Sequence, residues 1–241
     1  MTRSDWVTIP HGDLAIDAYY ARPEGDGPFP GVIVIQEIFG VNPHIRAVTE
    51  RLAAAGFAAI APNIYQRTAP GLELGYNAAD TALGREHKDA TTAPQLLGDL
   101  QATIDWLQAR PEVKRGPVGS IGFCFGGHVV YLGATLPGIG ATASYYGGGI
   151  ATFCPGGGPA TIHRTPDIHG TVYAYFGTRD PLIPNEQIDA IEAALTAASP
   201  RHRVFRYPVG HGFNCDARPD YDTHAAADAW AHTLELFRRV L

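Results

Sequence analysis

The sequence lacks a long apolar run, a cluster of basic residues and a regular pattern of cysteines. No apolar stretch approaches the roughly 18 residues that a membrane-spanning helix needs, and residues 1–6 do not begin a signal peptide. The formal net charge is −6 and no Lys/Arg cluster is present, which argues against a nucleic-acid-binding surface. We therefore expect a cytoplasmic protein whose partners include neither nucleic acid nor a membrane.

Metal and cofactor motifs are also missing. The three cysteines, Cys124, Cys154 and Cys215, are an odd number and too widely spaced for a disulfide framework or a zinc motif. The histidines lack the spacing of known metal sites, and the glycine-rich segment 147–159 lacks the Gly-Lys-Ser/Thr pattern of a nucleotide loop. The sequence thus predicts no metal, no cofactor and free thiols.

Length and composition favour one domain of the α/β class. The chain has 241 residues, of which 45% are hydrophobic, enough for one large core over residues 1–241. An amino-terminal hairpin over residues 6–21 precedes alternating strands and helices, which predicts a mostly parallel central sheet with helices on both faces. One strand is expected to begin at residue 118. The other expected strands are 31–35, 57–62, 141–146, 171–177 and 203–208. The expected helices are 42–55, 93–108, 127–136, 184–199 and 223–240. The weakly patterned connection 63–90 is typical of a functional flap.

The segment 118–130 carries the strongest chemical signal. It combines a short apolar strand, a tight turn and the start of a helix, with Cys124 at the apex and Gly122 and Gly126 two residues to either side. This is the Gly-x-nucleophile-x-Gly elbow, with cysteine in place of the commoner serine. Helical N–H groups aimed at the sulfur favour the thiolate. The alternative is a free cysteine that serves only as a small core residue.

Three further side chains follow strands of the predicted sheet. They are Glu37, Asp180 and His211, and ligands of open α/β sheets bind at the carboxyl ends of strands. Singly, Asp180 before a proline is an ordinary turn residue and His211 between glycines an ordinary loop residue. Together with Cys124 they appear in the order nucleophile, acid, base, which predicts a catalytic triad.

These motifs resemble the dienelactone hydrolase (carboxymethylenebutenolidase) family, which has the α/β-hydrolase fold. The resemblance covers nearly the whole chain and lies in the segments 30–40, 122–127, 177–181 and 210–213. It implies a hydrolase that opens cyclic enol lactones through an acyl-enzyme. By the same resemblance Cys124 is the nucleophile, His211 its base and Asp180 the group that orients His211. Glu37 would hold the resting thiol and then help to deprotonate it.

Acyl transfer also needs donors for the developing oxyanion. The backbone N–H of Phe125, directly after the nucleophile, and that of Ile38, in the loop after a strand, are the candidates. A thiolate attacks activated carbonyls readily but expels poor alkoxides reluctantly. An enol lactone leaves as a stabilised enolate, so the predicted chemistry suits it.

Substrate recognition is less sharply indicated. The resemblance implies that a substrate carboxylate binds an arginine of the flap and another a few residues after the catalytic histidine. Here the first arginine after His211 is Arg218, seven residues on, so a broader esterase or lactonase range is also open. The candidate substrate-binding residues are Arg85, Tyr76, Phe39 and Tyr145.

The sequence leaves two other functions open. One is a broad-range carboxylesterase or thioesterase without a dienelactone role. The other is a non-catalytic ligand-binding protein, since a fold does not determine a function. If the protein is a lactone hydrolase or a broad-range esterase, we expect a small ester or lactone substrate. We expect a monomer or a small homo-oligomer.

Overall fold

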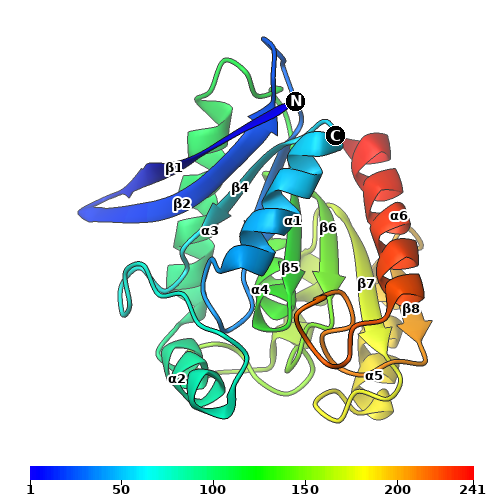
Figure 1. The fold of residues 1–241 in the computed structure, drawn as a ribbon. Helices are drawn as coiled ribbons and strands as arrows, with labels where there is room; N and C mark the ends of the chain where they lie inside the picture. Colours follow the sequence, from blue (N-terminus) through cyan, green and yellow to red (C-terminus); the bar gives the residue numbers. More distant parts are fainter.

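The computed structural model describes all 241 residues and contains one eight-stranded sheet (Figure 1). The strand order is β1-β2-β4-β3-β5-β6-β7-β8. The first two strands form an antiparallel hairpin, and every pairing from β3 to β8 is parallel, as predicted. The strands are β1 (Thr2–His11), β2 (Leu14–Pro23), β3 (Gly31–Ile35), β4 (Ala58–Pro62), β5 (Val118–Phe123), β6 (Ile139–Tyr145), β7 (Thr171–Gly177) and β8 (Arg203–Tyr207).

Helices cover both faces of this sheet. In Figure 1, α1 and α6 lie in front of the sheet and α3 and α4 behind it. The helices are α1 (Pro43–Ala54), α2 (Ala78–Asp89), α3 (Ala93–Gln108), α4 (Phe125–Gly133), α5 (Asn185–Ala198) and α6 (Thr223–Val240), with a 3-10 helix η1 (Thr161–Asp167). No helix combines the length and the apolar composition needed to cross a bilayer.

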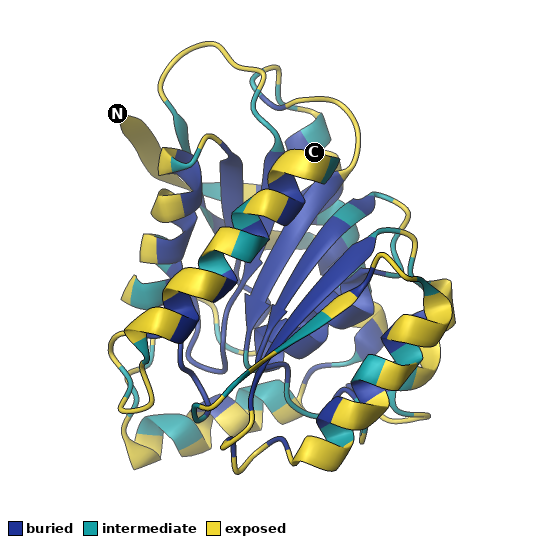
Figure 2. Cartoon of the chain, turned by 90° about the vertical axis from the view of Figure 1, so that its right-hand side faces the viewer, coloured by how far each residue is buried: buried dark blue, intermediate teal, exposed yellow.

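The central strands form because their apolar runs are buried on both faces. Every residue of β3, β4 and β5 is buried, and Figure 2 shows the sheet enclosed between the helices. Near-continuous apolar strands are typical of such parallel sheets. The first helix, α1, begins where Asn42 accepts a hydrogen bond from the Ile45 N–H at 3.2 Å, with Pro43 in its first turn. This cap explains why the predicted start was correct.

The connection 63–90 differs from the prediction because it contains the helix α2. Among the residues of α2 only Gly84 is buried, so this helix has no apolar stripe by which a sequence pattern would reveal it. Its signal is the cap, because Asn77 accepts from the Asp80 N–H at 2.9 Å. Three other starts were predicted too late, since β1 begins at Thr2, α4 at Phe125 and β6 at Ile139.

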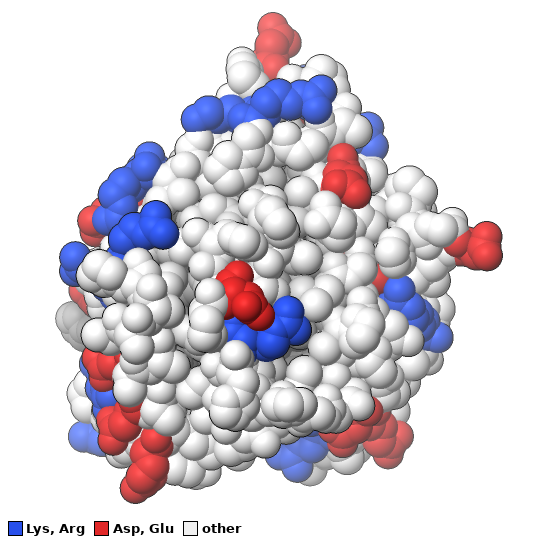
Figure 3. All heavy atoms as spheres, turned by 180° about the vertical axis from the view of Figure 1, so that it is seen from behind, with Lys and Arg blue, Asp and Glu red and all other residues white.

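The surface charge is mixed rather than one-sided. Figure 3 shows basic and acidic side chains interspersed over the face opposite to that of Figure 1, with most of that face uncharged. This distribution accords with the absence of a basic cluster in the sequence.

Candidate active site

Cys124 occupies a strained turn between β5 and α4. Its backbone has φ 54° and ψ −117°, a left-handed conformation that is costly for a residue with a Cβ. The adjacent backbones approach so closely that a Cβ on Gly122 would lie 2.1 Å from the Gly126 oxygen. A Cβ on Gly126 would lie 2.3 Å from the Gln36 oxygen. The two glycines therefore permit the turn that presents the sulfur, as the sequence motif predicted.

His211 and Asp180 meet at the same sheet edge, after β8 and β7. His211 Nδ1 lies 2.6 Å from Asp180 Oδ2, and both side chains are almost fully buried. The other Asp180 oxygen accepts from the Leu182 N–H at 2.8 Å, which fixes the carboxylate. Since Nδ1 bonds to a carboxylate it carries a proton, and the buried Nε2 has no hydrogen-bond partner. Nε2 is thus the nitrogen available for proton exchange.

The surroundings of His211 favour its charged form. Burial lowers the pKa of His211, but the charge of the Cys124 sulfur and the hydrogen bond with Asp180 outweigh it and raise the pKa to about 10. The Tyr146 ring and the imidazole pack in a T-shaped arrangement, with ring centroids 5.2 Å apart. A negative charge on the Cys124 sulfur would therefore stabilise an imidazolium at His211.

Cys124 and His211 line one cavity of about 430 Å³. Its other walls include Ile38, Phe39, Tyr76, Arg85, Lys88, Phe125, Phe153 and Arg218. The Ile38 N–H makes no hydrogen bond within the protein. Phe125 is the first residue of α4, so its N–H has no partner within the helix. Both expected oxyanion donors are thus free at the cavity wall.

Tyr145 does not line the cavity, and the expectation that it contacts substrate is corrected. Its side chain is fully buried, and its hydroxyl lies 2.8 Å from Thr233 Oγ1 of α6. Because side chains alternate between the two faces of a strand, the last residue of β6 points toward the α6 face. The next residue, Tyr146, instead packs against His211.

Glu37 is buried but does not hold the resting thiol. It accepts a hydrogen bond from Arg218 Nη1 at 2.8 Å, and no hydrogen bond joins it to Cys124. The charge of Arg218 compensates the burial of the carboxylate, which is 1% exposed. Arg218, although seven residues after His211 in the sequence, thus lies in the cavity wall and beside Glu37.

The flap helix α2 contributes two cations to the cavity. Arg85 and Lys88 are three residues apart and so share one side of the helix. Lys88 Nζ lies 5.1 Å from the centre of the Phe153 ring. The helix packs tightly on the loop after β3, because a Cβ on Gly84 would lie 2.4 Å from the Ile38 oxygen. Sequence reasoning missed Lys88 because it missed the helix, whose cap was the available signal.

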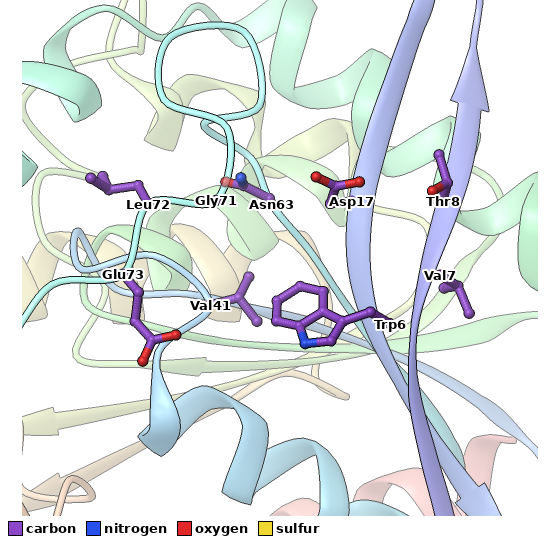
Figure 4. Close-up of a pocket in the computed structure, with 9 residues that line it drawn as sticks. All are labelled: Trp6, Val7, Thr8, Asp17, Val41, Asn63, Gly71, Leu72 and Glu73. Atoms are coloured by element: carbon purple, nitrogen blue, oxygen red, sulfur yellow. The ribbon is translucent and has the colours of Figure 1, made fainter.

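A second hollow of about 310 Å³ lies between the amino-terminal hairpin and the flap. Figure 4 shows its lining, in which the Asp17 carboxylate lies above the indole of Trp6. No cysteine, serine or histidine is among the lining residues. This hollow therefore lacks the nucleophile and base that the first cavity contains.

Comparison with known proteins agrees with this geometry. The model of the dienelactone hydrolase family matches residues 16–241. The chain belongs to this family. A Synechocystis protein named "Putative carboxymethylenebutenolidase" is 52% identical over 98% of this chain and 96% of its own length. Carboxymethylenebutenolidase 1 of Cupriavidus pinatubonensis is 31% identical over 91% of this chain and 89% of its own.

The solved structures identify the fold. A crystal structure from Klebsiella pneumoniae, described as "Putative Dienelactone Hydrolase", has a TM-score of 0.90 and 32% identity and covers 99% of both chains. The predicted α/β-hydrolase fold is therefore confirmed. Membership of the family makes the protein a hydrolase that acts on esters or lactones.

Proposed function

We propose that this dienelactone hydrolase family member opens enol lactones, or cleaves activated esters, through an acyl-enzyme on Cys124. The observation that carries the proposal is the shared cavity of Cys124 and His211. There the histidine has its Nδ1 bonded to Asp180 and its Nε2 without a partner. The reducing cytoplasm is the compartment we propose, since it keeps the thiol active.

The proposed reaction has two steps. The Cys124 thiolate attacks the carbonyl carbon while the N–H groups of Ile38 and Phe125 stabilise the oxyanion. The C–O bond then breaks, and the enolate leaves with a proton from the His211 imidazolium. In the second step neutral His211 takes a proton from water, the hydroxide attacks the thioester, and the carboxylic acid product and Cys124 are released. One water is consumed for each ester bond cleaved.

The charges at the cavity favour an anionic substrate. Arg85 and Lys88 line the cavity from α2, and Arg218 lines the same cavity. A carboxylate on the lactone would be attracted to these cations. The pairing of Arg218 with Glu37 favours the second candidate, a broad-range carboxylesterase or thioesterase, because it reduces the free positive charge.

Turnover by matched cysteine variants tests the proposal. Cys124→Ala is expected to abolish hydrolysis of both an enol lactone and an aryl ester. Cys154→Ala, which removes a partly exposed thiol outside the cavity, is expected to leave both rates unchanged. Undiminished hydrolysis by Cys124→Ala would exclude the proposed nucleophile. Equal rates on carboxylated lactones and on neutral aryl esters would favour the broad-range alternative.

A further inference from the structure

A second group of potential ligands lies outside the catalytic cavity. His44 in the first turn of α1 meets Cys215 and Asp216 of the loop after His211, and one ligand atom from each lies within 4.8 Å of the others. His44 Nδ1 is 3.9 Å from Asp216 Oδ1. We propose that His44, Cys215 and Asp216 form a binding site for a zinc ion.

Buried polar groups without partners support a missing ligand at this place. Asn214 is 3% exposed, and neither atom of its side-chain amide has a hydrogen-bond partner. The His44 side chain is 6% exposed, and its Nε2 also has no partner. Asn214, His44 and Asp216 line one hollow of about 210 Å³. Since buried polar groups in folded proteins are nearly always paired, the hollow is suited to an ion with its bound water.

The types of ligand atom determine which metal ion the site prefers. Thiolate and imidazole are preferred by zinc, whereas calcium and magnesium prefer oxygen ligands. Atoms bound to one zinc ion are roughly 3 to 4 Å apart, so the group must contract by about 1 Å. The Asp216 side chain, which is 79% exposed, is free to adjust, and the Cys215 sulfur would leave its hydrogen bond to the Tyr76 hydroxyl. The remaining tetrahedral position would hold water from the hollow.

Zinc binding requires one proton to leave. The Cys215 thiol now donates a hydrogen bond to the Tyr76 hydroxyl, with 3.3 Å between sulfur and oxygen. On binding, the S–H bond breaks, the proton passes to solvent and the sulfur forms a bond to zinc. The ion would then link α1 to the loop that carries His211 and Arg218, both at the catalytic cavity.

A cobalt titration tests the site directly. Co²⁺ takes zinc sites and shows a charge-transfer band only with a thiolate ligand. The variant Cys124→Ala/Cys154→Ala keeps Cys215 as its single cysteine, and we expect it to develop the band with one equivalent of Co²⁺ and lose it on addition of Zn²⁺. A protein without the band would overturn the proposal.

Substitution of an exposed ligand tests the site in a protein that is expected to remain folded. Asp216→Asn changes an exposed side chain and is expected to weaken Zn²⁺ binding at least about tenfold in the same background. The control Asp13→Asn alters an exposed carboxylate in the turn between β1 and β2 and should leave the affinity unchanged. Equal affinities for the two variants would exclude Asp216 as a ligand and contradict the site.

Discussion

Cys124 and Tyr146 are the two non-glycine residues with a left-handed backbone, and both lie at the candidate active site. Such conformations persist only where the surrounding structure enforces them. Cys124 is held by the close approach of β5 and α4, and Tyr146 by a 2.7 Å hydrogen bond from its N–H to the Tyr175 oxygen. The strain thus falls on the proposed nucleophile and on the aromatic ring that packs against its base.

Substitution of Gly126 tests the elbow at this scale. Gly126→Ala would place a Cβ 2.3 Å from the Gln36 oxygen and 2.4 Å from the Ile35 oxygen, both on backbone that cannot move freely. We expect the free energy of unfolding to fall by at least about 2 kcal/mol, with loss of hydrolysis. The control Gly148→Ala has a nearest neighbour at 4.0 Å and should change stability by less than about 1 kcal/mol. Equal stabilities in urea unfolding would contradict this account of the turn.

Among the elements, those with a strong apolar pattern were predictable from the sequence. The α3 helix matches its predicted range because buried leucines recur on one side, and β3 matches because its five residues are all apolar or glycine. The α2 helix was not predictable in this way, since it rests on a polar cap and on one buried glycine. Lys88 was missed along with it.

Side-chain pairings between residues far apart in the chain also could not be predicted from the sequence. Strand ends placed Cys124, Asp180 and His211 at one edge, because topology alone brings strand ends together. The pairing of Glu37 with Arg218 joins residues 181 positions apart and depends on how the last loop folds back. The proximity of His44 to Cys215 depends on the same loop.

The two cations of α2 give a prediction for this element. Arg85→Ala and Lys88→Ala are each expected to raise KM for a carboxylated lactone about tenfold, the loss of roughly 1.4 kcal/mol of binding. The KM for a neutral aryl ester should stay within about twofold of the native value, since an uncharged substrate makes no ion pair with these side chains. Arg3→Ala is the matched control, because Arg3 lies in β1 outside the cavity. A similar rise for both substrates would show that α2 contributes shape rather than charge.

Over the whole molecule, buried histidines make stability depend on pH. His128 of α4 is fully buried, with Nδ1 2.9 Å from the Gly148 oxygen and Nε2 2.7 Å from Thr161 Oγ1. Burial lowers the pKa of His128 to about 4. Between pH 6.5 and 4 the unfolded chain therefore binds a proton that the folded chain does not, and this part of the stability is lost as the pH falls. For His211 the sign is reversed, and its contribution is lost as the pH rises from 6.5 to about 10.

His128→Gln isolates the acidic window. Glutamine has an amide N–H₂ to donate to Gly148 but does not titrate. The difference in unfolding free energy between the native protein and this variant should shrink as the pH falls from 6.5 to 4. Urea unfolding at several pH values measures it. A difference that stays constant with pH would show that His128 does not titrate as proposed.

The central claim is that Cys124 forms the covalent intermediate, and mass spectrometry of the trapped acyl-enzyme tests it most directly. In the native protein, acid quench within the first turnover should stop the reaction before His211 activates water for deacylation. After brief reaction with an enol lactone and acid quench, we predict that the peptide with Cys124 gains the full mass of the lactone, since ring opening retains every atom. An unmodified Cys124 with the added mass on another residue would contradict the account.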